Sequence, residues 1–187
     1  DPSKSRGLGD VYKRQVIQPG ESNYDKVRQV YNGMIDKRPL LIAQAKTVSD
    51  VQTAVRFGNE NDLLVAIRGG GHNGGGLGIC DDGLVIDLSA FKEIDVDASG
   101  KTVRVGGGVL LRELDAETHK YGLAVPSGMI GSTGVAGLTL GGGIGYLSRK
   151  GGLTIDNLLE AEVVLANGEV VTTCLLYTSP SPRDLLG

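Results

Sequence analysis

The alternation of apolar and polar residues in the first half of the chain predicts short strands around one well-defined helix. Residues 47–60 carry apolar side chains at helical spacing after a threonine, which predicts an amphipathic helix. A shorter helix is predicted over residues 24–32. Short apolar runs predict strands at residues 40–44, 63–67 and 84–88. After the short helix, the expected order is strand, helix, strand, loop, strand.

The second half of the chain predicts further short elements around a long uncharged stretch. The predicted elements are strands at 91–96 and 102–105, a helix at 110–121, and a hairpin whose strands, 161–166 and 169–173, flank Asn167 and Gly168. The Asn-Gly pair predicts a type I′ turn. No charged residue lies between Lys120 and Arg149. The glycine, serine, threonine and proline residues of this stretch make it too polar for a membrane span.

Composition narrows the function classes. The 187 residues include 30 glycines, about twice the usual share, without a collagen-like triplet repeat. This excess indicates that some part of the fold needs close backbone approach. The net charge of −3 provides no electrostatic attraction for nucleic acid or an anionic membrane, so neither is expected as a partner.

The two ends of the chain resemble each other as DNA. Residues 5–15 read SRGLGDVYKRQ and residues 174–184 read CLLYTSPSPRD. These peptides can be translated from opposite strands of one DNA element, which resembles the adapter of a shotgun sequencing library. We therefore interpret residues 1–15 and 174–187 as adapter-derived and expect the natural segment at 16–173. Within that segment Cys80 is the single cysteine, which excludes an internal disulfide there.

The most informative segment is residues 69–78, in which seven of ten residues are glycine. It matches G-x-G-x-x-G after a strand, but the dinucleotide-binding motif needs a helix to begin at this loop. The next predicted element here is a strand, so we reject that interpretation. Gly100-Lys101-Thr102 is likewise rejected as a phosphate-binding loop, because Asp95 stands where its first glycine belongs.

What remains is a loop whose backbone N–H groups could form an anion-binding nest without a helix. Arg68 precedes this loop and His72 lies within it. A second glycine cluster lies in the uncharged stretch, at Gly134, Gly137, Gly141, Gly142, Gly143 and Gly145. Two nests and an uncharged stretch suit a long, flat ligand with a diphosphate. No metal site is expected, because His119 falls on a solvated helix and His72 lacks partners.

Three motifs together resemble a known family. They are R-G-G-G-H-N at residues 68–73, the glycine-rich run at 128–145, and G-L-T-I-D-N-L-L at 152–159. They are similar to the FAD-binding domain of berberine-bridge-enzyme-like oxidoreductases, in the vanillyl-alcohol-oxidase flavoprotein superfamily. The resemblance implies an α+β, two-lobed PCMH-type domain with mixed sheets flanked by helices. The lobes would span residues 16–90 and 91–173, with the second incomplete and the chain cut before the substrate domain.

The resemblance also implies a cofactor and the residues that hold it. In the family, the histidine of the R-G-G-G-H loop bonds to the 8α-methyl of the flavin, which implies that His72 binds FAD covalently. Some members add a cysteine link, but Ile130 occupies that position, so a single histidyl link is expected. The implied cofactor-binding residues are Arg68, Gly69, Gly70, Gly71, His72, Asn73, Gly74, Ser132, Thr133, Gly134, Gly137, Gly141, Gly142 and Gly145. Tyr146 is expected either at the flavin edge or in the core.

The implied reaction is transfer of hydride from a C–H of an alcohol, sugar or related small molecule to the flavin. Oxygen or another acceptor would then take the electrons. The family's catalytic residues would lie beyond the cut, so the chain alone is expected to be inactive. Two alternatives stay open: a non-covalent FAD dehydrogenase of the same superfamily, and an inactive FAD- or nucleotide-binding module.

Overall fold

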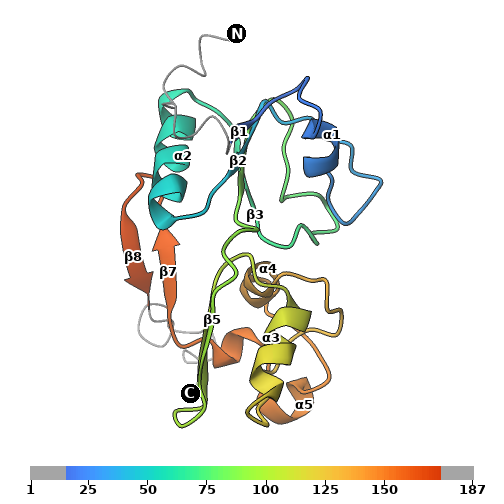
Figure 1. Ribbon diagram of the computed structural model, residues 1–187, viewed down its shortest axis with the longest axis vertical. Coiled ribbons are helices and arrows are strands. Elements are labelled where there is room, and N and C mark those ends of the chain that lie inside the picture. The colour runs from blue at the N-terminus through green and yellow to red at the C-terminus, as the bar shows by residue number, and fades with distance from the viewer. Residues whose placement is uncertain (1–15, 174–187) are drawn as a thin grey trace, which may run out of the picture.

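The computed structural model describes residues 16–173. The two segments interpreted as adapter-derived, 1–15 and 174–187, lie outside the described residues. Within the described part, no helix is long and apolar enough to cross a membrane. Sheets and helices are mixed along the chain, which confirms the expected α+β class (Figure 1).

A four-stranded sheet organises the first part of the chain. Its strands lie in the order β1 (Val16–Ile17), β2 (Leu41–Gln44), β4 (Leu84–Asp87) and β3 (Val65–Arg68). β2 and β3 both run parallel to β4, whereas β1 is antiparallel to β2. All four residues of β4 are buried, as expected for a central strand that is apolar on both faces.

Helix α2 (Val48–Glu60) connects β2 to β3 and covers one face of this sheet (Figure 1). It begins with a capping box, in which the side chains of Thr47 and Asp50 each accept a backbone N–H of the other residue. Its buried residues, including Val55 and Phe57, pack in one cluster with Leu84 of β4. The helix predicted at 47–60 is therefore confirmed.

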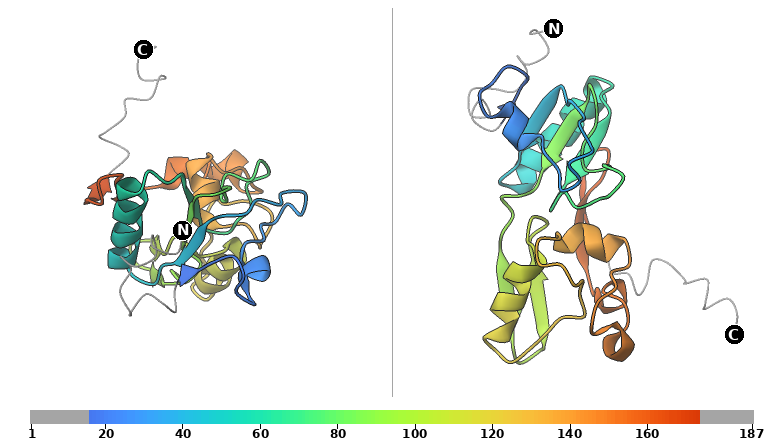
Figure 2. Two further views of the ribbon diagram at one scale, coloured as in Figure 1. Left: turned by 90° about the horizontal axis from the view of Figure 1, so that it is seen from above. Right: turned by 90° about the vertical axis from the view of Figure 1, so that its right-hand side faces the viewer.

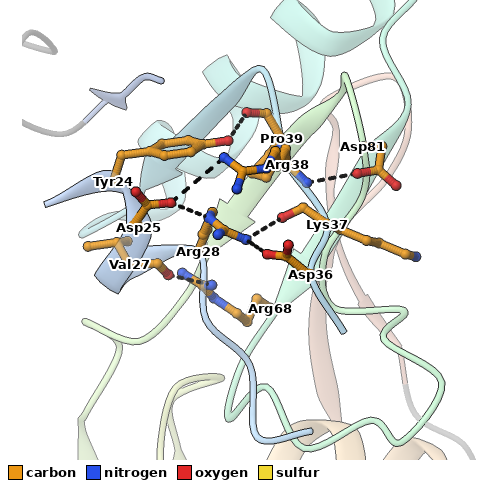
Figure 3. Close-up of polar contacts among 10 residues, drawn as sticks. All are labelled: Tyr24, Asp25, Val27, Arg28, Asp36, Lys37, Arg38, Pro39, Arg68 and Asp81. Atoms are coloured by element: carbon orange, nitrogen blue, oxygen red, sulfur yellow. Dashed lines mark hydrogen bonds and ion pairs between the residues drawn. The ribbon is translucent and has the colours of Figure 1, made fainter. Parts of the chain in front are cut away.

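The opposite face carries α1 (Tyr24–Val27) and the irregular segment after it. Tyr24 is buried with residues of the sheet, and its hydroxyl donates to the Pro39 carbonyl over 2.7 Å. The side chain of Arg28 bonds Asp25, Asp36 and the Lys37 carbonyl, which fixes the segment's path (Figure 3). The helix predicted over 24–32 is wrong beyond residue 27.

The helix ends early because a long-range hydrogen bond competes with its continuation. The N–H of Tyr31, which would continue the helix, donates instead to the Gly71 carbonyl over 3.0 Å. Tertiary contact thus overrides local helix propensity at this point.

The second part of the chain has its own small core. Its helices and the strand pair next to them lie together, away from the four-stranded sheet (Figure 2). Its elements are β5 (Ile94–Asp97), β6 (Thr102–Val105), α3 (Leu111–His119), α4 (Val135–Leu140), α5 (Ser148–Gly151) and a 3₁₀ helix at Ile155–Asn157. β5 and β6 form an antiparallel pair, and Leu111, Leu114 and Val135 are buried together beside it. Helix α4 was not predicted, because its sequence VAGLTL combines glycine with β-branched residues that disfavour helices.

A hairpin of β7 (Ala161–Val164) and β8 (Val170–Thr173) returns to α2 (Figure 1). Gln52 donates to the Gly168 carbonyl over 2.7 Å, and Asn59 donates to the Ala166 carbonyl. The predicted hairpin is confirmed, but the type I′ turn is wrong. That turn needs positive φ at both central residues, and only Gly168 has it, so the loop is a wider one closed by a left-handed glycine.

Candidate functional site

The glycine-rich loop leaves the carboxyl end of β3. No helix begins between residue 69 and the start of β4 at Leu84, so the rejection of the dinucleotide-binding motif is correct. Gly71 has φ of +66°, a left-handed conformation that glycine adopts without strain. Within the described part of the chain, the N–H groups of residues 69–74 donate no hydrogen bond. These N–H groups form a set of unpaired donors of the kind that binds anions.

Arg68 anchors the start of this loop rather than projecting from it. Its side chain is 6% exposed, and it donates to Asp87 of β4 over 2.9 Å and to the Val27 carbonyl over 2.8 Å. These contacts join β3, β4 and α1. The positive charge of Arg68 therefore has a buried carboxylate as its partner.

The second glycine-rich segment packs directly against the loop. A Cβ on Gly70 would collide with the backbone of Gly134, and a Cβ on Gly134 would collide with Gly70. A Cβ on Gly69 would likewise collide with the carbonyl oxygen of Gly107. Val135 N–H donates to the Val109 carbonyl over 2.9 Å, which attaches the second segment to the chain before α3. Glycine at positions 70 and 134 is thus required for the two loops to meet.

This contact brings His72 to the hydroxyl groups of the second segment. Its Nε2 lies 2.9 Å from Ser132 Oγ, and its Nδ1 lies 3.4 Å from Thr133 Oγ1. Burial lowers the pKa of His72 below its usual value of 6.5. His72 is therefore a neutral imidazole at neutral pH, with a hydroxyl group near each ring nitrogen.

One face of the imidazole is covered by Tyr31. The two rings are stacked, with centroids 3.8 Å apart and an interplanar angle of 19°. Tyr31 as a whole residue is 63% exposed. Sequence reasoning missed this residue, because nothing in its local pattern distinguishes it from a surface tyrosine.

An open cavity of about 500 Å³ lies beside these groups. Its lining residues are Lys26, Val27, Gln29, Val30, Tyr31, Gln44, Arg68, Gly69, Gly70, Gly71, His72, Asp87, Ser89 and Ser132. Six of them were singled out in the sequence, namely Arg68, Gly69, Gly70, Gly71, His72 and Ser132. The others come from α1 and the segment after it, from β2, and from β4 and the residues after it, and only Asp87, a carboxylate at the end of an apolar strand, gave a sequence signal.

The remaining residues singled out in the sequence have varied surroundings. Asn73 turns back on its own loop, where its side chain accepts the Leu77 N–H over 3.1 Å. Gly74 and Gly137 have open space where a Cβ would point. Gly142 has φ of +98°, and Gly145 packs against the Ser127 carbonyl.

Two further residues singled out in the sequence, Gly141 and Tyr146, lie in or directly after the same glycine-rich segment. Gly141 lies against the carbonyls of α4. Tyr146 is 82% exposed, so it does not pack in the core formed by the described residues.

Comparisons with known proteins identify relatives of this arrangement. A family model described as an FAD binding domain matches residues 39–174. The chain is 40% identical over 157 residues to (R)-6-hydroxynicotine oxidase of Paenarthrobacter nicotinovorans, covering 84% of this chain and 34% of that protein. It is 35% identical over 170 residues to berberine bridge enzyme-like 8 of Arabidopsis thaliana, covering 84% and 32%.

The fold agrees with that of a solved relative. The crystal structure of 6-hydroxy-D-nicotine oxidase from Arthrobacter nicotinovorans superposes with a TM-score of 0.84 at 39% identity, covering 87% of this chain and 36% of that one. The expected PCMH-type FAD-binding fold is thereby confirmed. The chain spans about a third of the length of these relatives.

Proposed function

The chain belongs to the FAD binding domain family, and on that premise we propose that it is the flavin-holding part of an oxidoreductase in which His72 bonds covalently to the cofactor. The parent enzyme would take hydride from a C–H of an alcohol, sugar or related small molecule and pass the electrons to oxygen or another acceptor. One observation carries this proposal: His72, a neutral imidazole, lines a cavity together with the first glycine-rich loop and Ser132 of the second segment.

The residues present fit FAD. The unpaired N–H groups of residues 69–74 offer donors for a diphosphate, and Gly69, Gly70 and Gly71 themselves line the cavity. Ser132 and Thr133 add hydroxyl groups around His72. Gly74 and Gly137 have free space for a ligand, and we retain both among the proposed contacts, with Asn73, Gly134, Gly141, Gly142 and Gly145.

Arg68 is retained with a defined role. Its guanidinium is held by Asp87 and the Val27 carbonyl, yet it also lines the cavity. Arg68 would therefore support the loop that binds the diphosphate and place positive charge beside it.

FAD, when bound, supplies the isoalloxazine that accepts the electrons and hydrogen of the substrate C–H bond. Attachment joins a nitrogen of His72 to the flavin 8α carbon. This attachment would be a two-electron oxidation: the imidazole N–H proton of His72 and one 8α proton would be released, and dioxygen or another acceptor would take the two electrons. His72 must be neutral for this, because only a neutral imidazole has a free nitrogen lone pair. The burial of His72 maintains that form.

The test uses the full-length protein that contains these residues. It would be expressed, precipitated in acid and digested, with the His72 peptide examined by mass spectrometry. We expect yellow colour in the precipitate and a peptide heavier by the mass of FAD, and the His72→Ala variant should release its flavin into the supernatant. Flavin released by the wild-type protein would support the non-covalent alternative. Absence of any flavin would contradict FAD binding itself.

Substrate class is tested separately on the same preparation. Reduction of the bound flavin without oxygen can be followed by its loss of absorbance on adding alcohols, sugars or 6-hydroxynicotine, the compound in the name of one relative. Flavin that is bound but reduced by none of a broad panel would favour the inactive binding module.

A further inference from the structure

Tyr31 has an unusual combination of exposure and order. Its side chain is more than half exposed, so its ring is not held by a surrounding core. Nevertheless the ring lies flat on His72, with centroids 3.8 Å apart. Hydroxyl groups contact the edges of the imidazole, whereas Tyr31 covers a face. The hydroxyl groups and the tyrosine therefore restrain different motions of the same ring.

The backbone holds Tyr31 in this place. Its N–H donates to the Gly71 carbonyl over 3.0 Å, and the Asn32 side chain donates to the Gly74 carbonyl over 2.9 Å. Residues 31 and 32 are thus bonded to both sides of His72 along the loop.

The segment before Tyr31 is attached to the sheet as well. Arg68 donates to the Val27 carbonyl, and Arg28 bonds three groups in residues 25–37 (Figure 3). These bonds give the Tyr31 ring a fixed position relative to the loop that carries His72.

We propose that Tyr31 is a positioning residue that sets the plane of the His72 imidazole for covalent attachment of the flavin. The inference rests on the proposed function, because it concerns the same covalent bond. A nucleophilic nitrogen reacts only when its lone pair points at the electrophilic carbon, and rotation of a histidine ring moves that lone pair. The hydroxyl groups of Ser132 and Thr133 can rotate with the ring edge, whereas a stacked aromatic face opposes tilting.

The test separates binding of FAD from attachment. Full-length apoprotein is mixed with FAD, the dissociation constant is taken from rapid quenching of flavin fluorescence, and the attachment rate is taken from acid-quenched samples over time. The variants are Tyr31→Phe, which keeps the stacking, and Tyr31→Leu and Tyr31→Gln, which remove it. Tyr121→Leu is the matched control, because Tyr121 is 54% exposed at the end of α3 and does not line the cavity.

We expect Tyr31→Leu and Tyr31→Gln to slow attachment at saturating FAD by about two- to tenfold, the range for losing one aromatic stacking contact, so that any change in the dissociation constant does not enter the rate. Tyr31→Phe and Tyr121→Leu should attach flavin at the wild-type rate. Attachment by Tyr31→Leu at the wild-type rate would overturn the proposal, and so would loss of FAD affinity without a change in rate. A slow Tyr31→Phe would also overturn it, since the hydroxyl and not the stacked ring would then matter.

Failure of the proposed function gives a different result. A wild-type protein that binds FAD but never attaches it removes the reaction that Tyr31 is proposed to assist. Both proposals then fall together. Covalent flavin in the wild-type protein with no effect of Tyr31→Leu overturns the role of Tyr31 alone.

Discussion

Individual side chains in this site divide into those that hold the loop and those that face the cavity. Arg68 precedes the R-G-G-G-H loop as expected, and the sequence suggested that it contacts the cofactor. The structure adds a partner that local pattern could not reveal, because Asp87 lies on a strand that becomes a neighbour only in the folded sheet. His72 was recognisable from its motif, whereas Tyr31 was not, since its role depends on a contact between distant segments.

The buried ion pair of Arg68 and Asp87 gives a stability prediction. Removing one partner leaves an unpaired buried charge, which typically costs about 3–5 kcal/mol. We expect Arg68→Gln and Asp87→Asn each to lower the free energy of unfolding of the full-length protein by that order in urea. The double variant should lose less than the sum of the two, because it leaves no lone charge. Additive losses would show that the two charges do not interact.

The low pKa of His72 gives a prediction about pH. Burial lowers this pKa below 6.5, so the neutral form that we propose to react with flavin persists to lower pH than in an exposed histidine. The attachment rate at saturating FAD should therefore fall as the pH is lowered, with a midpoint below 6.5. The other charged groups at the cavity are Lys26 and the paired Arg68 and Asp87. A rate that falls with a midpoint above 6.5 would contradict a lowered pKa for the half-buried His72.

At the scale of elements, two glycine segments meet because neither has side chains at the contact. The distance from an added Cβ to its nearest neighbour distinguishes glycines that the packing requires from glycines with free space beside them. We expect Gly70→Ala and Gly134→Ala to destabilise even the apoprotein, since each new Cβ meets backbone that cannot move aside. Gly137→Ala should leave apoprotein stability unchanged or raise it by up to about 1 kcal/mol, because alanine favours helix α4.

The same comparison tests the ligand contacts. If Gly137 faces the flavin, Gly137→Ala weakens FAD binding although the apoprotein is intact. Gly33→Ala is the matched control, because Gly33 also has open space and was not proposed to contact FAD. Thermal unfolding and FAD titration of the four variants measure both effects. Equal loss of stability in all four would show that the collisions do not matter.

How far the elements could be predicted depended on where their stabilising contacts lie. Helix α2 combines an amphipathic pattern with a capping box within its own sequence, so it was predicted almost to the residue. Helix α4 has no such signal, because Gly137 and the β-branched Val135 and Thr139 lower its helix propensity. The hairpin was predictable, but its turn was not, since the turn residues contact Gln52 and Asn59 on α2.

For the whole molecule, the family motifs predicted the fold class, whereas apolar pattern alone could not have done so. Short runs such as 40–44 and 84–88 predict strands but not that β2 and β3 flank β4 in parallel. That order depends on pairing between segments far apart in sequence. The return of β7 and β8 to α2 is likewise invisible in the local pattern, because the contacts span more than 100 residues.

Several large apolar side chains between residues 129 and 147 remain exposed in the described part of the chain, with Leu140 at 74%, Ile144 at 69% and Tyr146 at 82%. Since the chain spans about a third of its relatives, we propose that the rest of the parent protein and the flavin cover them. A chain of residues 16–173 should therefore enhance the fluorescence of an apolar dye more strongly than the full-length protein. Leu140→Ser with Ile144→Ser should reduce that difference. Met34→Ser should not, because Met34 is 90% exposed but lies outside this stretch. Equal dye binding by the short and full-length chains would mean that this surface stays open to solvent in the complete enzyme.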